Sequence, residues 1–329
     1  MYVIKYNVQE KYNVQNTYNV QSGENMKTVT KNAYAKVNLA LGITGVREDG
    51  YHLVDMIMHK LELHDEVTVE AEELSEASEG TKELPVSMEI VGNPLLSEET
   101  NSKLESNLCV KAYMKYFDNQ SKKPKIRIKL LKNIPMAAGL AGGSADCAAV
   151  LLILNEIYGL FSENELFNIA SRLGADVPFC LSSEKCMRCE GIGEILTPAP
   201  AISGVDILLA KIKEGMSTPE CYKTYDKICE ENSGIIIQPN IEKCIEKLAV
   251  RDLVGLNDCA YNVLEPVTCK KYTHLLDIEK IIIDKNSVFV RMTGSGPTIF
   301  GLFESYSDEI YQDIVTLKDD ITFVHTRML

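Results

Sequence analysis

The part of the sequence best suited to chemistry is a run of small residues at 135–143, which reads Pro-Met-Ala-Ala-Gly-Leu-Ala-Gly-Gly. Small side chains let a backbone turn tightly and bring several N–H groups to one point. An apolar stretch starts at Ser144, and a helix there would add its N-terminal partial positive charge. The run is neither a Walker A loop nor a Rossmann loop, because the spacing and the closing residues differ. It therefore predicts a site for an anion such as a triphosphate, although a simple tight turn has the same composition.

Two isolated charges stand in apolar surroundings elsewhere in the chain. Asp176 stands two residues after a glycine in residues 174–178, which read Gly-Ala-Asp-Val-Pro. Such an aspartate is either a catalytic carboxylate or an ordinary helix N-cap. Lys36 is the lone charge in the run 33–43 and, taken alone, favours a lysine on the solvent face of a strand. Neither residue decides a function by itself.

Two glycine turns complete the candidate segments. Residues 49–52 read Asp-Gly-Tyr-His, a turn signal followed by an aromatic ring and an imidazole. This pattern suits packing and ligand recognition equally well. Residues 293–297 read Thr-Gly-Ser-Gly-Pro and, taken alone, predict a tight hairpin.

Hydrophobic periodicity indicates the elements that must position these segments. Alternating apolar residues predict strands at 33–43, 53–70, 86–91, 126–130, 205–212, 287–291, 297–303 and 321–325. Helical spacing and caps predict helices at 102–117, 144–158, 162–174, 218–231, 240–248, 272–284 and 307–317. We expect the acidic stretch 70–84 to be a solvated loop or hairpin tip.

Strands and helices mix in both halves without regular βα alternation, which favours two α+β domains over a doubly wound sheet. The Pro-Ala-Pro segment at 198–200 is the best linker, so we expect domains at 26–198 and 199–329. Residues 1–25 contain Tyr-Asn-Val-Gln three times, with too little apolar mass to fold alone. They are either a disordered tail or spurious upstream sequence, with translation starting at Met26.

Composition limits the classes of function. The 329 residues are 45% hydrophobic and 25% charged, which is typical of a soluble globular protein. A formal net charge of -13 argues against nucleic acid as the main partner, and no apolar run is long enough to span a membrane. Ten scattered cysteines indicate reduced thiols and a cytoplasmic location. Cys186 and Cys189 have no second pair to make a zinc site, so we interpret them as small buried residues.

Four segments together resemble the motifs of the GHMP superfamily of small-molecule kinases, in the order of that family. They are residues 35–39 (Ala-Lys-Val-Asn-Leu), 135–144, 174–178 and 293–296. Residues 49–52 resemble the branch that acts on a cytidine-diphosphate-linked methylerythritol in non-mevalonate isoprenoid biosynthesis. The likeness covers nearly the whole chain from about Met26. It implies a two-domain α+β fold, with an N-terminal domain like domain 2 of ribosomal protein S5, a ferredoxin-like C-terminal domain and a cleft between them.

The resemblance implies transfer of a phosphoryl group from ATP to the 2-hydroxyl of 4-diphosphocytidyl-2-C-methyl-D-erythritol. Asp176 would be the general base, and Lys36 would hold both this carboxylate and the hydroxyl. The residues implied for binding the substrate are Asn38, Tyr51, His52, Thr218 and Tyr222, with Tyr222 stacked on the cytosine ring. Those implied for binding ATP are Asn107, Lys132, Pro135, Met136, Ala137, Ala138, Gly139, Leu140, Ala141, Gly142, Gly143, Ser144 and Ala145.

The resemblance also implies Mg²⁺ across the ATP phosphates, although no motif names a protein ligand for it. We expect ATP and the small-molecule substrate as partners, no nucleic acid or membrane, and a monomer or weak homodimer. Ala145 stands where the family usually has a second serine, which removes one hydroxyl near the phosphates. Two alternatives stay open: a GHMP kinase for a mevalonate-type or homoserine-type alcohol, and a GHMP-fold protein that binds ligands without turnover.

Overall fold

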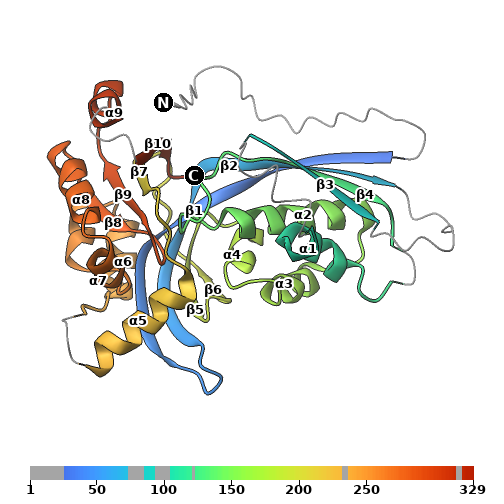
Figure 1. The fold of residues 1–329 in the computed structure, drawn as a ribbon, viewed down its shortest axis with the longest axis horizontal. Coiled ribbons are helices and arrows are strands. Elements are labelled where there is room, and N and C mark those ends of the chain that lie inside the picture. The colour runs from blue at the N-terminus through green and yellow to red at the C-terminus, as the bar shows by residue number, and fades with distance from the viewer. Residues whose placement is uncertain (1–25, 73–84, 93–103, 121–122, 232–235, 316–320) are drawn as a thin grey trace.

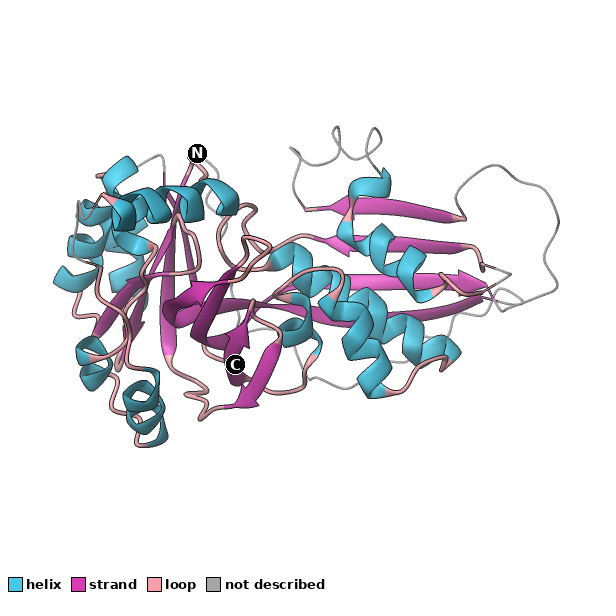
Figure 2. Ribbon diagram, turned by 90° about the horizontal axis from the view of Figure 1, so that it is seen from below, coloured by secondary structure: helices cyan, strands magenta, loops and turns pink. Residues whose placement is uncertain are grey.

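The computed structural model describes residues 26–72, 85–92, 104–120, 123–231, 236–315 and 321–329. In this part of the chain two sheets form, each with helices packed on it (Figures 1 and 2). A long antiparallel hairpin belongs to the first sheet, in which β1 (Met26–Val46) pairs with β2 (His52–Glu72) from end to end. The Asp-Gly signal at 49–50 lies in the turn of this hairpin, as predicted.

Within the described residues, the first sheet has the strand order β3-β4-β2-β5-β6, with β1 paired to β2. Its remaining strands are β3 (Val86–Val91), β4 (Ile126–Leu131), β5 (Cys186–Gly191) and β6 (Ile195–Pro198). A 3-10 turn (Leu104–Ser106) precedes its helices, which are α1 (Leu108–Tyr116), α2 (Gly142–Tyr158), α3 (Glu163–Ser171) and α4 (Val177–Leu181). The apolar faces of α1 and α2 meet the sheet around Val67, Ile128 and Val150. This packing fixes the start of α2, where the small-residue run ends.

The second sheet has the order β10-β7-β9-β8. Its strands are β7 (Asp206–Ile212), β8 (Phe289–Met292), β9 (Thr298–Phe303) and β10 (Ile321–Arg327). Between β7 and β8 come α5 (Thr218–Glu230), α6 (Ile241–Ala249), a 3-10 turn (Val254–Asp258), α7 (Glu265–Lys271) and α8 (Leu275–Asp284); α9 (Asp308–Val315) precedes β10. Along the chain the order is strand, helices, two strands, helix and strand, and the last strand lies beside the first in the sheet. This is the ferredoxin-like arrangement that the resemblance implies.

The β1–β2 hairpin is shared by both halves of the molecule. In Figure 1 the two blue strands pass over helices α1–α4 and then bend toward α5. The N–H of Leu41 donates to the carbonyl of Tyr261 at 2.9 Å, and the N–H of Val263 donates to the carbonyl of Leu41 at 3.0 Å. One apolar core also joins the hairpin residues Val37 and Leu39 to Phe300 of the second sheet. The hairpin can therefore present side chains to a site formed by both halves.

Several predicted boundaries are wrong. The first strand starts at Met26 rather than at 33, because the mainly polar residues 26–32 pair with 66–72 of β2. The predicted acidic loop is wrong for residues 70–72, which end β2; there Glu70 pairs with Lys129 at 2.5 Å. The rest of that stretch, 73–84, and the repeat-bearing segment 1–25 lie outside the described residues.

The helix predicted at 102–117 is a 3-10 turn followed by α1 within its described part, 104–117. Helix α7 and strands β5 and β6 were not predicted. All ten cysteines are unpaired, and Cys186 and Cys189 are buried on β5, which confirms that they are small buried residues. No helix of the described residues is long and apolar enough to cross a membrane.

Candidate active site

Lys36 of β1 and Asp176 at the start of α4 lie together, although they are far apart in the sequence. The Lys36 Nζ atom is 3.7 Å from Oδ2 of Asp176 and donates a 2.6 Å hydrogen bond to Oδ1 of Asn38. The Lys36 side chain is only 5% exposed, so the solvent-facing interpretation of this lysine is wrong. The β1–β2 register shifts between Tyr34 and Lys36, and such a bulge re-aims the side chains of a strand.

Asp176 has a carboxylate that is open to a ligand. The residue occupies the N-cap position of α4, as one of the two interpretations predicts, but its side chain makes no capping hydrogen bond and so is not used up by the helix. Its side chain is 31% exposed, and Lys36 is its ion-pair partner. A carboxylate that is held by one cation and still reachable can accept a proton from a bound hydroxyl.

The small-residue run forms a turn that leads directly into α2. Ala137, Gly139 and Ala141 have φ values of 48°, 71° and 56°, in the left-handed region that non-glycine residues seldom adopt. Ala141 precedes the helix, and no side chain caps the first turn of these 17 residues. The first N–H groups of a helix have no partner within it, so an uncapped N-terminus favours an anion. The backbone here supports the predicted phosphate site.

A second glycine segment, residues 293–296 between β8 and β9, packs against this turn. The buried Thr293 hydroxyl lies 3.3 Å from the Gly139 carbonyl and accepts a 3.0 Å hydrogen bond from the N–H of Asn38. A Cβ atom on Gly139 would lie 2.6 Å from the carbonyl oxygen of Thr293, so only glycine fits. Asn262 donates from Nδ2 to the carbonyls of Met292 and Gly294 and holds this segment from behind. Three predicted motifs therefore meet at one place.

His52 and Tyr222 meet at the other end of the hairpin. Their ring centroids are 4.6 Å apart, and the rings are tilted by 34°. The His52 Nε2 atom is 2.7 Å from Oδ1 of Asp226, which lies one helical turn after Tyr222 on α5. The edge of Tyr225 completes the group at 6.2 Å from the His52 ring. Two rings fixed in this way form a surface suited to a flat base.

The other residues implied for the substrate have different surroundings. Tyr51 is 59% exposed and contacts the Arg47 guanidinium, which lies 5.6 Å from the ring centroid. The structure therefore does not bring Tyr51 against the His52–Tyr222 pair. The Thr218 hydroxyl, in the first turn of α5, lies 3.1 Å from that of Ser295. This contact joins α5 to the segment that packs on the small-residue turn.

Lys132 and Asn107, implied for ATP, are engaged by the protein itself. The Lys132 ammonium donates to Asp65 and, at 2.6 Å, to Asp146 of α2. Burial opposes the charge of this lysine, but the two carboxylates together raise its pKa. Burial raises the pKa of Asp146, whose Oδ1 atom has no hydrogen-bond partner. The Asn107 side chain accepts from the N–H of Cys109 and caps α1.

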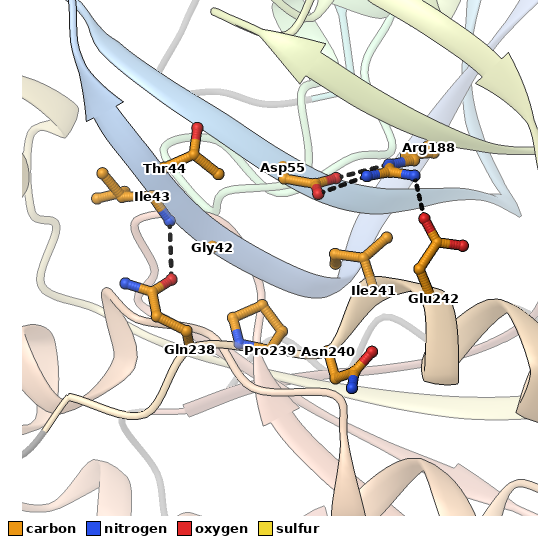
Figure 3. A pocket seen from close by; sticks show the side chains of 10 residues that line it. All are labelled: Gly42, Ile43, Thr44, Asp55, Arg188, Gln238, Pro239, Asn240, Ile241 and Glu242. Carbon is orange, nitrogen blue, oxygen red and sulfur yellow. Dashed lines mark hydrogen bonds and ion pairs between the residues drawn. The ribbon is translucent and has the colours of Figure 1, made fainter.

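A hollow of about 360 Å³ lies elsewhere on the hairpin (Figure 3). Asp55 lines the hollow, whereas the next residue, Met56, contacts Asn38, which in turn binds Lys36. Successive residues of a strand point to opposite faces of the sheet. The hollow is therefore on the face away from Lys36. Its polar wall is largely paired, because Arg188 binds both Asp55 and Glu242. The complete lining is Gly42, Ile43, Thr44, Asp55, Arg188, Gln238, Pro239, Asn240, Ile241 and Glu242.

Comparison with known proteins connects this geometry to a family. The model of the GHMP kinases N terminal domain matches residues 107–184, and that of the GHMP kinases C terminal domain matches residues 241–316. The chain is 39% identical to the 4-diphosphocytidyl-2-C-methyl-D-erythritol kinase of Acetivibrio thermocellus, over 85% of this chain and 92% of that protein. It belongs to the GHMP kinases. The enzyme of the same name from Clostridium novyi is 36% identical, over 89% of this chain and 98% of that protein.

Solved structures agree with this membership. The crystal structure of a 4-(cytidine 5'-diphospho)-2C-methyl-D-erythritol kinase superposes with a TM-score of 0.70 at 28% identity, over 91% of this chain and 99% of that one. The crystal structure of L. major mevalonate kinase in complex with R-mevalonate superposes with a TM-score of 0.67 at 13% identity, over 93% of this chain and 98% of that one, and supports the fold alone. The predicted two-domain GHMP kinase fold is confirmed.

Several residues of the candidate site were not predicted from the sequence. Asp226 has no motif around it, because its only signal is helical spacing from Tyr222. Asn262 lies in a loop before α7, and nothing in the local pattern links it to residues 293–296. Asp146 of α2 shares the Lys132 ammonium with Asp65, which lies in a distant strand. Each role depends on a contact between distant parts of the chain.

Proposed function

We propose that this chain transfers the terminal phosphoryl group of ATP to the 2-hydroxyl of 4-diphosphocytidyl-2-C-methyl-D-erythritol. The observation that carries the proposal is the pairing of Lys36 with a reachable Asp176, tied through Asn38 and Thr293 to the turn that precedes α2. The names of the relatives support this choice of substrate.

Phosphoryl transfer needs mainly positioning and charge stabilisation. In the proposed mechanism, the N–H groups of residues 135–145 and the uncapped start of α2 hold the phosphates. Asp176 accepts the proton of the substrate hydroxyl as that oxygen attacks phosphorus. The Lys36 ammonium, held by Asn38 beside the carboxylate, would attract the charge on both the carboxylate and the phosphoryl group.

Mg²⁺ belongs to this proposal as a companion of ATP. Among the described residues, no group of three or more His, Cys, Asp or Glu side chains could hold a metal ion. An ion bound mainly by phosphate oxygens takes only one or two protein ligands, and oxygen is the atom it prefers. The Ser144 hydroxyl in the first turn of α2 offers such an oxygen. When bound, the ion neutralises charge on the phosphates.

The cytidine end of the substrate is proposed to bind at the His52–Tyr222 pair. Tyr222 offers a ring face for stacking on cytosine, and Asp226 fixes the orientation of the His52 imidazole. Thr218 lies on the same helix and closer to Ser295, between this pair and the phosphoryl-transfer residues. An extended substrate could therefore contact the base pocket and the catalytic pair at once.

A substrate panel tests the proposal. Purified protein with ATP and Mg²⁺ is offered the cytidylyl-methylerythritol compound, mevalonate and homoserine, and ADP release is followed. We expect turnover of the cytidylyl compound alone. Turnover of mevalonate or homoserine in its place would assign the chain to another GHMP activity, and binding without any ADP release would indicate a ligand-binding protein.

A further inference from the structure

A second buried lysine on the hairpin holds the other end of the helix that follows Asp176. Lys60 of β2 is the pairing partner of Lys36 in the β1–β2 register, and side chains directly opposite each other on antiparallel strands share one face. Like charges in such a pair repel, so both ammonium groups need acceptors. Lys36 finds Asp176 just before α4. The Lys60 ammonium donates to the carbonyl of Ser182, just after α4, and lies 3.5 Å from the carbonyl of Cys180.

Helix α4 depends on such contacts for its position. It has five residues and so spans about 7.5 Å, which is too short for a helix to be stable alone. A cation at the carboxyl end satisfies carbonyls that have no partner within the helix. The Lys60 ammonium is also 5.5 Å from the ring centroid of Phe179, within α4 itself.

The strand that carries Lys60 is itself firmly fixed. The N–H of Lys60 donates to the carbonyl of Lys185 at 2.8 Å, and the carbonyl of Lys60 accepts from the N–H of Leu329 at 3.0 Å. The side chain is 5% exposed, so solvent competes little for its ammonium. The two ends of α4 are thus held by two neighbouring residues of one rigid hairpin.

We propose that Lys60 is a positioning residue for phosphoryl transfer: it sets where α4 lies and thereby the distance between Asp176 and Lys36. This inference rests on the proposed function, in which Asp176 is the base. Displacing a reacting group by about 1 Å can cost on the order of 100-fold in rate. Losing the contacts of Lys60 should therefore lower kcat while leaving the separate phosphate and cytidine contacts, and hence both KM values, close to those of the wild type.

The test compares Lys60→Met with Lys60→Arg in the full chain. We expect Lys60→Met to lower kcat between about 10- and 100-fold, and Lys60→Arg, which keeps a cation and donors, to recover most of that loss. Lys129→Met is the matched control, because Lys129 lies on β4 of the same sheet and pairs with Glu70, away from α4. A kcat of Lys60→Met equal to that of the control would overturn the inference, as would a rise in KM alone.

A double-variant cycle separates this inference from the proposed function. If Lys60 acts through Asp176, Lys60→Met should lower the residual turnover of Asp176→Asn, measured with radiolabelled ATP, far less than it lowers that of the wild type. If Lys60→Met lowered turnover by the same factor in the wild type and in Asp176→Asn, positioning through Asp176 would be refuted. Full activity of Asp176→Asn alone would instead refute the proposed base. If Lys60→Met does not fold, Lys60→Gln, which removes the positive charge and shortens the reach to the carbonyl of Ser182, is judged by the same criteria.

Discussion

The close approach of Gly139 to the carbonyl of Thr293 predicts what a single methyl group would do. Gly139→Ala places a Cβ atom 2.6 Å from that backbone oxygen, closer than van der Waals contact allows. The left-handed conformation of this residue costs an alanine about 1–2 kcal/mol, and overpacking typically adds about 1–3 kcal/mol. Because Thr293 also accepts from Asn38, the shift should reach the candidate site. We expect the free energy of unfolding to fall by the sum, about 2–5 kcal/mol.

Gly159→Ala provides the matched control for this substitution. Gly159 has a φ of 61°, and a Cβ atom there would meet nothing within 4 Å. It should therefore lose only the conformational part, about 1–2 kcal/mol, and keep its activity. Urea unfolding of both variants gives the stability difference, and ADP release at varied ATP gives kcat/KM, which we expect to fall on the order of 10-fold in Gly139→Ala alone. Equal losses of stability and activity in the two variants would refute the close packing of the two glycine segments.

Two further predictions concern histidines of the hairpin. Burial lowers the pKa of His59 from 6.5 to about 4, and its Nε2 atom accepts a hydrogen bond from the N–H of Ile202. Between pH 4 and 6.5 the unfolded chain therefore binds more protons than the folded chain. The free energy of unfolding consequently falls as the pH drops from 6.5 to 4. Urea unfolding should show a decrease about 3 kcal/mol smaller in His59→Gln than in the wild type over this range, and parallel curves would contradict the role of His59. Asp226→Asn removes the anion beside His52 and should raise KM for the cytidylyl substrate on the order of 10-fold, with KM for ATP unchanged. Tyr222→Phe keeps the aromatic ring and should leave both KM values unchanged. An equal rise in KM in Tyr222→Phe would argue against stacking as the main contact of the base.

The sequence predicts much of the fold because apolar side chains alternate clearly. Val37 and Leu39 face the core as their spacing indicates, and most strands fall near their predicted positions. Strand ends were missed where pairing rather than apolar burial forms the strand, as at residues 26–32. Helix α7 has only seven residues and ends in two lysines, so it lacks the repeated apolar spacing that identifies longer helices.

The site was predictable only where motifs carry it. Residue types and spacing singled out Lys36, Asp176 and the small-residue run, but they favoured a solvent-facing Lys36, because local spacing does not show that residues distant in the chain, such as Asp176, cover that face of the strand. A lysine within an apolar run, such as Lys60, gives no sequence signal of the helix end that it contacts. Contacts of this kind depend on the tertiary fold, which local patterns do not specify.

In the proposed mechanism, Asp176 accepts the proton of the substrate hydroxyl beside Lys36. The most direct measurement is steady-state ADP release by Asp176→Asn with the cytidylyl-methylerythritol substrate, with Asp118→Asn as the control at an exposed carboxylate paired to Lys115. Loss of a general base predicts a fall in kcat on the order of 100- to 10,000-fold, with both substrates still bound and the control unchanged. Turnover by Asp176→Asn at the wild-type rate would contradict the mechanism.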